Sequence, residues 1–167
     1  AYVDQVAQGL DTKPSCKVGT TADLSATYNN GTLGVGATLT ATSGGALSID
    51  SVTPNVADRI LVKDQTDASE NGIYVVTTVG AAETAFVLTR ATPEDQPSEL
   101  TGGSFVFVEE GTIGSNNGYT FTHTGAPTFG TTDLDVAQFS GAGQITAGAA
   151  LSKAGNTIDV EVDGASV

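Results

Sequence analysis

The chain has 167 residues, among them 21 glycines, and it contains no tryptophan or methionine. Acidic residues outnumber basic ones 19 to 6, for a net charge of −13, and the basic residues are scattered along the chain. This balance argues against nucleic acid as a partner, because binding phosphates needs clustered lysine and arginine. It also argues against an anionic membrane, and no run reaches the ~18 apolar residues needed to cross a bilayer.

The beginning of the chain predicts an arm followed by a connector. In "YVDQVAQGL" (2–10), Val3, Val6 and Leu10 are spaced to share one face of a short helix. Residues 11–27 are rich in Thr and Ser and only weakly periodic. We therefore expect residues 1–27 to form an N-terminal helix or arm and a connector. The absence of methionine predicts a chain that was processed or that is part of a longer protein.

Residues 28–140 predict the main domain, which we expect to be all-β. Short runs rich in branched or aromatic residues, separated by Gly- and Asn-containing turns, indicate strands. These runs cover residues 37–42, 59–63, 72–78, 85–90, 104–110 and 119–124. The pattern favours an antiparallel β-sandwich or barrel. The run "SFVFVEE" (104–110) is apolar on both faces, which predicts that a second layer or a neighbouring subunit covers both of its sides.

Residues 141–167 differ in composition from the main domain. Glycine recurs at short intervals in "GAGQITAGAALSKAGNTIDVEVDGASV", which predicts small repeating turns in a fibre-like segment. Within it, residues 157–163 alternate like a strand, with Ile158, Val160 and Val162 on one face. That face is small for an isolated segment, which favours self-association.

The loop in "VKDQTDASENGIYVV" (62–76) is the first candidate site. Asp64, Asp67 and Glu70 could share one side of a helical turn, and clustered carboxylates are ligands for hard cations. The spacing of a calcium-binding loop is absent, so we expect no metal and no cofactor there. The alternative is a structural turn capped by Asp64, followed by Gly72 in a conformation that glycine permits.

No catalytic constellation stands out. Cys16 is the only cysteine and His123 the only histidine, which excludes an internal disulfide and the usual zinc patterns. We expect Cys16 to fill apolar space and His123 to pack on a strand face. Acid pairs such as Glu109 with Asp95 can be nominated for glycoside hydrolysis, but nothing singles one out. We therefore expect no catalytic residues.

Two arginines and a tyrosine are the candidates for binding a glycan. Arg59 and Arg90 each end a strand beside acidic residues, and we expect them to hold loops through paired hydrogen bonds to carboxylates. The alternative is contact with an acidic sugar, with Tyr28 as an exposed stacking partner. Tyr74, within "GIYVV", is expected in the core.

Three runs carry a resemblance to a known group of proteins. They are "ADRILVKDQTDASENGIYVV", "LTRATPEDQPSELTGGSFVFVEEGT" and "AQFSGAGQITAGAALSKAGNTIDV". Together they resemble a structural module of tail-fibre and baseplate-associated proteins of tailed bacteriophages, including phages of marine cyanobacteria. The resemblance covers roughly residues 37 to 160. It implies a glycine immediately before the Asp58–Arg59 pair, where this chain has Ala57.

The resemblance implies a non-enzymatic structural protein of the virion that takes part in host attachment. It implies a homotrimer located in the phage tail, with other tail proteins as partners and a host surface polysaccharide as a further candidate. Two alternatives differ in class. One is a host-glycan-binding module, and the other is a fragment of a tail-associated polysaccharide depolymerase.

Overall fold

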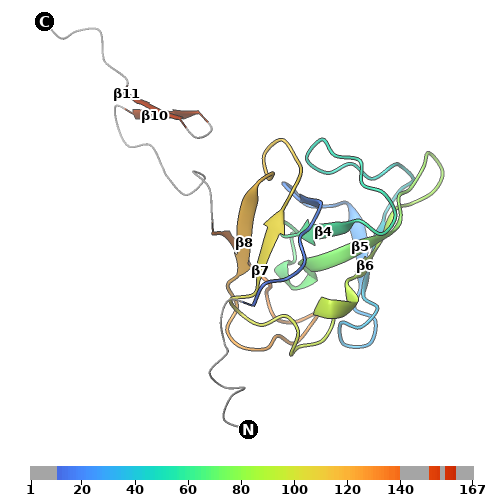
Figure 1. The fold of residues 1–167 in the computed structure, drawn as a ribbon. Helices are drawn as coiled ribbons and strands as arrows, with labels where there is room; N and C mark the ends of the chain where they lie inside the picture. The colour runs from blue at the N-terminus through green and yellow to red at the C-terminus, as the bar shows by residue number, and fades with distance from the viewer. Residues whose placement is uncertain (1–10, 140–150, 155–156, 161–167) are drawn as a thin grey trace, which may run out of the picture.

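The computed structural model describes residues 11–139 together with two short strands, 151–154 and 157–160. Within these residues the chain is all-β, as expected, and its only helical elements are two 3-10 turns (Figure 1). These are η1 (Ala68–Glu70) and η2 (Thr92–Glu94). The helix expected over residues 2–10 and most of the segment 141–167 lie outside the described residues.

One sheet has six strands in the order β1-β4-β5-β6-β3-β2. Every pairing in it is antiparallel except that of β1 with β4. Its strands are β1 (Val18–Gly19), β2 (Ala26–Asn29), β3 (Thr38–Ala41), β4 (Arg59–Val62), β5 (Gly72–Thr78) and β6 (Val87–Arg90). Neither this sheet nor the next closes into a barrel within the described residues.

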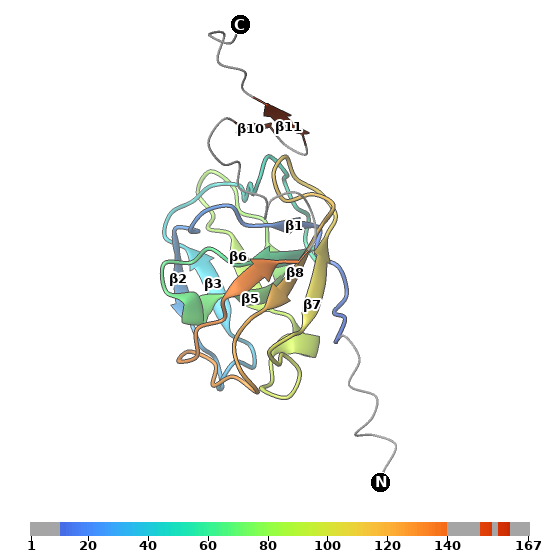
Figure 2. The ribbon, with the colours of Figure 1, turned by 90° about the vertical axis from the view of Figure 1, so that its left-hand side faces the viewer.

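The second sheet is an antiparallel meander of three strands. They are β7 (Phe105–Val108), β8 (Asn117–Phe121) and β9 (Val136–Gln138). Figure 2 shows this sheet on the side of the molecule toward the viewer, in front of the larger sheet. A separate antiparallel hairpin pairs β10 (Leu151–Ala154) with β11 (Thr157–Val160), where the sequence predicted a strand over 157–163.

Two apolar clusters cover both faces of the six-stranded sheet. The inter-sheet cluster joins it to β7 and β8, and it includes Leu61, Ile73, Val106, Val108, Tyr119 and Phe121. The second cluster packs on the opposite face and includes Val18, Leu39, Ile60, Val62, Tyr74 and Leu88. Side chains alternate between the two faces of a strand, so β4 and β5 contribute to both clusters. This explains why "ILV" and "IYVV" are almost continuously apolar.

The strand β7 is fully covered on only one of its two faces within the single chain. Val106 and Val108 are fully buried, but on the other face Phe105 is only half-buried and Phe107 is 38% exposed. Within the single chain a second layer therefore covers only one side of this strand, and cover of the other side by a neighbouring subunit stays a prediction. The doubly covered strands are β4 and β5 instead.

Residues 11–20 are an integral part of the folded body, although their composition predicted a connector. The segment first runs parallel to β7, where Lys13 N–H donates to the Phe105 carbonyl and Cys16 N–H to the Phe107 carbonyl. It then crosses to the larger sheet as β1, beside β4. Cys16 and Val18 are fully buried in the inter-sheet and second clusters respectively. One continuous stretch therefore links both sheets and both clusters.

The described body begins and ends at opposite ends of the three-stranded sheet. Residue 11 lies beside Phe105, where β7 starts, since the Phe105 N–H donates to the Asp11 carbonyl. Phe139 lies beside Gly118, near the start of β8, and donates its N–H to the Gly118 carbonyl. Because β8 is antiparallel to both of its neighbours, β9 runs in the same direction as β7 and as residues 11–17. The chain therefore has one direction along both borders of the sheet.

Ala57 occupies a backbone conformation that suits glycine. Its φ is +74°, in the left-handed region, and its side chain is exposed. A residue with a Cβ pays roughly 1–2 kcal/mol there. The structure thus gives a physical reason for the glycine that the resemblance implied before Asp58.

Ala57→Gly should therefore stabilise the protein by about 0.5–1 kcal/mol, the relief of strain less the added entropy of the unfolded chain. Urea unfolding followed by circular dichroism measures this change. The matched control is Ala126→Gly, because Ala126 is also exposed but is not among the residues with positive φ. We expect the control to lower stability slightly, and a loss of stability in both variants contradicts the strain at Ala57.

Candidate functional site

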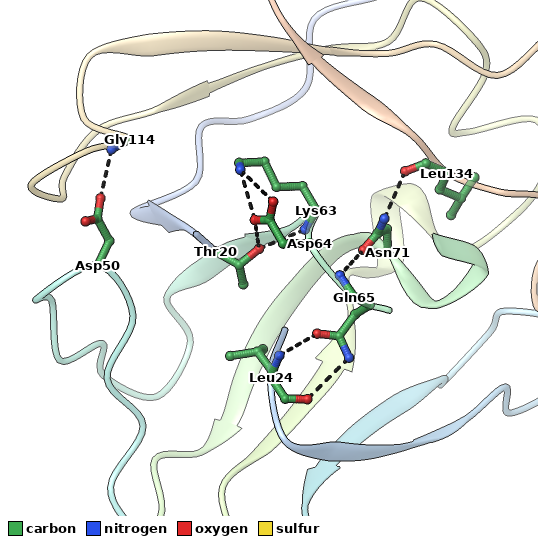
Figure 3. A network of polar contacts seen from close by, with 9 residues as sticks. All are labelled: Thr20, Leu24, Asp50, Lys63, Asp64, Gln65, Asn71, Gly114 and Leu134. Carbon is green, nitrogen blue, oxygen red and sulfur yellow. Dashed lines mark hydrogen bonds and ion pairs between the residues drawn. The ribbon is translucent and has the colours of Figure 1, made fainter. Parts of the chain in front are cut away.

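The loop between β4 and β5 is a tightly bonded turn. Asp67, rather than the expected Asp64, is the N-cap of η1, and its carboxylate accepts the Ser69 N–H at 3.0 Å. Asn71 closes the loop, because its Oδ1 accepts the Gln65 N–H at 3.0 Å and its Nδ2 donates to the Leu134 carbonyl at 3.4 Å. Figure 3 shows the two bonds of Asn71, one to Gln65 and one to Leu134.

The same loop is bonded to residues 20–24 (Figure 3). Thr20 donates its hydroxyl to Asp64 at 2.8 Å, and that carboxylate also pairs with Lys63 Nζ at 2.9 Å. The Gln65 amide accepts the Leu24 N–H at 2.8 Å and donates back to the Leu24 carbonyl at 3.4 Å. These bonds fix the N-terminal segment against the larger sheet.

The three carboxylates considered for a metal have separate partners. Asp64 is bonded to Thr20 and Lys63, Asp67 to the Ser69 N–H, and Glu70 accepts from the Gln65 amide at 3.4 Å. Hydrogen bonds from Ser69 lower the pKa of Asp67, whereas burial raises the pKa of Glu70. Nowhere in the part of the chain that the structure describes do three or more metal-ligating side chains form a group. The arrangement is that of a structural turn.

Gly72 adopts a positive φ of +145°, as the sequence predicted. A Cβ built there would lie 2.2 Å from Nη1 of Arg90. The glycine therefore meets two requirements at once: a backbone angle that other residues avoid, and room for the guanidinium group.

Arg90 is buried, at 2% exposure, and does not reach the surface as a glycan contact would require. Nη1 donates to the Asn71 carbonyl at 3.1 Å, and Nη2 donates to the Tyr74 hydroxyl at 3.0 Å and to the Tyr28 hydroxyl at 3.3 Å. The guanidinium carbon lies 4.9 Å from the Tyr74 ring centre and 4.5 Å from that of Phe129. The expected pairing with carboxylates is wrong for Arg90, which is held by oxygen acceptors and two aromatic rings instead.

Tyr28 is half-buried against the second cluster rather than freely exposed. Its hydroxyl donates to Asn30 Oδ1 at 2.7 Å and accepts from Arg90, so both functions of the group are used. Tyr74 is fully buried, as expected. Of the three residues considered for a glycan, Tyr28 and Arg90 therefore bond to each other within the packed body.

Arg59 makes the expected bond to a carboxylate, but as a single contact. Its Nη2 lies 2.9 Å from Oε1 of Glu94, which is fully buried on η2. Among the described residues, Oε2 of Glu94 and Nε of Arg59 have no hydrogen-bond partner. Burial raises the pKa of Glu94, and the nearby Arg59 opposes this shift without cancelling it. Such a half-satisfied buried pair adds little stability.

Glu94→Gln should change how stability depends on pH. Because the pKa of Glu94 is higher in the folded state than in the unfolded state, protonation of Glu94 stabilises the fold. This contribution is complete below the unfolded pKa of about 4.3 and is lost as pH rises through the folded pKa. We therefore expect the variant to gain stability relative to the wild type between pH 4 and pH 7, measured by urea unfolding at both. A relative loss over this interval means that attraction to Arg59 outweighs burial.

Cys16 and His123 do not form a nucleophile and base. Burial raises the pKa of Cys16 to about 12, so its thiol stays protonated inside the inter-sheet cluster. His123 instead bonds the Leu100 carbonyl through Nε2, at 3.1 Å. Asp95 is buried after η2, while Glu109 is exposed and bonded to the Ser15 hydroxyl. These groups occupy packed or peripheral positions without a shared cleft.

A small pocket of 130 Å³ lies between residues 20–24 and 48–50. Its two carboxylates are already bonded: Asp50 accepts the N–H groups of Ile113 and Gly114 at 2.9 and 2.8 Å, and Asp23 accepts the Thr66 N–H at 2.8 Å. The Asp50–Gly114 bond is drawn in Figure 3. These acids hold loops together and leave the pocket without a free charged group of their own.

The feature that sequence reasoning missed is a group of exposed aromatic rings on the three-stranded sheet. Phe107 is 38% exposed and Phe139 is 65% exposed. The alternation of Phe and Val in "SFVFV" predicts two apolar faces, covered by a second layer or by a neighbouring subunit, but it does not show which residues stay exposed in the single chain. Phe139 stood at the edge of the expected domain and was not considered.

Comparison with known proteins adds no relative: no family model, no curated protein and no solved structure matches the chain. Among the described residues, no helix is long and apolar enough to span a membrane.

Proposed function

We propose that the chain is a non-enzymatic structural component of a bacteriophage tail, in a fibre or a baseplate, with a role in host attachment. The three sequence runs that resemble phage tail modules support this proposal, and two of them coincide with structurally central elements. The run "ADRILVKDQTDASENGIYVV" spans β4, η1 and most of β5, and the run that includes "SFVFV" spans η2 and β7.

The direction of the chain through the body is the observation that carries the proposal. Residues 11–17 and β9 run the same way along the two borders of one sheet, from the Phe105 end toward the Gly118 end. A module with this path can be inserted into an elongated protein without reversing the chain. That is the arrangement a fibre or a connecting part needs.

We assign the two sheets to a β-sandwich, because the inter-sheet cluster contains inward side chains of β4 and β5 on one side and of β7 and β8 on the other. A rigid two-layer body suits a structural part that holds its neighbours at a fixed distance. It is less suited to a protein that closes around a substrate.

We propose further that the chain self-associates as a homotrimer and contacts other tail proteins. The exposed aromatic side chains on β7 and after β9 support self-association. The strong negative charge favours keeping assembled particles apart in solution.

Phage particles whose genome encodes this chain provide the test. Antibodies raised against the purified protein should label the tail in electron micrographs, and mass spectrometry of purified particles should recover its peptides. The purified protein should release no reducing ends or unsaturated sugars from host polysaccharide. Absence from the particles contradicts the structural role, and sugar release that is lost on mutation of a carboxylate pair supports the depolymerase alternative.

A further inference from the structure

The outer side of the three-stranded sheet presents an aromatic face, which we define as Phe105, Phe107 and Phe139. Side chains alternate along β7, so Val106 and Val108 point into the inter-sheet cluster while both phenylalanines point outward. The rings of Phe105 and Phe139 meet edge to face, with centres 5.6 Å apart. In Figure 2 the three-stranded sheet lies toward the viewer, in front of the larger sheet.

Toward β8 and β9 the register of the sheet places uncharged residues beside this face. Phe107 lies opposite Gly118, whose carbonyl accepts the Phe139 N–H, so the two rings flank a position without a side chain. Phe105 lies opposite Thr120, which in turn lies opposite Ala137. The aromatic face is therefore bordered across the strands by Gly, Thr and Ala, in a chain that carries a net charge of −13.

We propose that a second copy of this chain docks on the aromatic face, so that three copies meet around an axis parallel to β7. This inference rests on the self-association stated above and names its surface. Two acidic copies repel each other through most of their surface, and an uncharged apolar face is where that repulsion is smallest. Carboxylates lie at the border of this face and not within it: the exposed Glu109 follows β7 and the exposed Asp135 precedes β9.

The path of the chain favours a copy of itself over an unrelated apolar partner. Residues 11–17 and β9 share the direction of β7 and border this same sheet. Rotation about an axis along β7 places three such sheets face to face and leaves all three chains parallel. The residues that precede 11 and follow 139 in each copy can then continue in the same direction, in a closed symmetric assembly.

The contact is made by side chains and not by strand addition at β7. Residues 11–17 already occupy the free edge of that strand, through bonds such as those from Lys13 N–H to the Phe105 carbonyl and from Glu109 N–H to the Cys16 carbonyl. With this edge covered, a neighbouring copy meets the flat outer side of the sheet.

The test compares the full-length wild type with the double variant Phe107→Ser/Phe139→Ser by light scattering and sedimentation. The wild type should be a trimer at micromolar concentration, and the variant should dissociate with an affinity at least about 100-fold weaker, since two aromatic contacts are removed. Both side chains project outward, so the variant should keep the far-ultraviolet circular dichroism of the wild type.

The matched control is Val56→Ser/Ile113→Ser, which removes two exposed apolar side chains that lie outside the aromatic face, 59% and 72% exposed. It should remain a trimer. Association of the wild type should also tighten as salt rises from 20 to about 300 mM, because salt screens repulsion between the acidic copies.

Three results overturn the inference, and they are distinguishable from a failure of the proposed function. A wild type that is monomeric at micromolar concentration contradicts both the trimer and the role of the aromatic face as its interface. A double variant that stays trimeric contradicts the aromatic face as the interface and leaves self-association standing. If the control variant dissociates as much as the double variant, the loss of association is not specific to the aromatic face. Location in the virion is measured separately by labelling and mass spectrometry.

Discussion

Gly72→Ala should lower the free energy of unfolding by roughly 3 kcal/mol or more, because two separate penalties add. The φ of +145° is strained for a residue with a Cβ, at a cost of about 1–3 kcal/mol. The new methyl carbon would also lie 2.2 Å from Nη1 of Arg90 and would displace the guanidinium from the Asn71 carbonyl. Leaving that buried acceptor unpaired adds a further penalty of about 1–3 kcal/mol.

The matched control for this variant is Gly36→Ala. Gly36 also has a positive φ, +69°, but a Cβ there meets nothing within 4 Å. We expect it to cost about 1–2 kcal/mol through backbone strain alone. Urea unfolding of both variants separates strain from displacement of Arg90. Equal losses in the two variants would show that the guanidinium moves aside without cost.

Deletion of residues 1–20 should unfold the main domain, whereas deletion of residues 1–10 should not. The longer deletion removes Cys16 and Val18, which are fully buried, and the backbone bonds that join this segment to β7 and β4. Burial of one valine contributes about 1.5–3 kcal/mol and each hydrogen bond about 1 kcal/mol. The sum exceeds about 5 kcal/mol, which is comparable with the whole stability of a domain of this size.

Circular dichroism and the dispersion of amide signals in nuclear magnetic resonance spectra measure the outcome. The shorter deletion serves as the control, because it leaves the described contacts of residues 11–20 with the two sheets in place. A cooperative thermal transition in the longer deletion, similar to that of the wild type, would contradict the role of this segment as the link between the two sheets.

The central strands could be predicted from the sequence because their local pattern is strong. The runs "RILVK", "GIYVVTT" and "SFVFVEE" are short, rich in branched and aromatic residues, and bounded by polar turns, and each contains a strand of the structure. Glycine at position 72 also carried a clear conformational signal, and its positive φ is confirmed. These features depend on neighbours in the sequence and can be inferred without knowledge of the fold.

The N-terminal segment could not be predicted, because its pairing is not local. Residues 11–17 contain Thr, Lys and Ser and show no hydrophobic periodicity. They nevertheless lie beside β7, which follows some ninety residues later in the chain. The short β1 is defined by its partner β4 and not by its own two residues. In such segments the free energy comes from a surface that the rest of the chain supplies.

The partners of the two arginines could not be predicted from the acids that lie beside them in the sequence. Glu94 and Asp95 follow Arg90 directly, which suggested a local ion pair, but Glu94 pairs with Arg59 instead. Arg90 points to Asn71, Tyr74 and Tyr28, on β5 and its preceding loop and on β2. Since strand alternation alone decides which way a side chain points, adjacency in sequence is a poor guide to partners in a sheet.

The shared direction of residues 11–17 and β9 has a mechanical consequence. Tension applied to the two ends of the described body draws residues 11–17 toward one end of the sheet and β9 toward the other. The backbone bonds between neighbouring strands lie across this direction, so they resist sliding together as a shear load. They do not open one after another like a zipper. A protein with this geometry resists a pulling force best when the force acts parallel to the strands. It unfolds most easily when the force acts perpendicular to them.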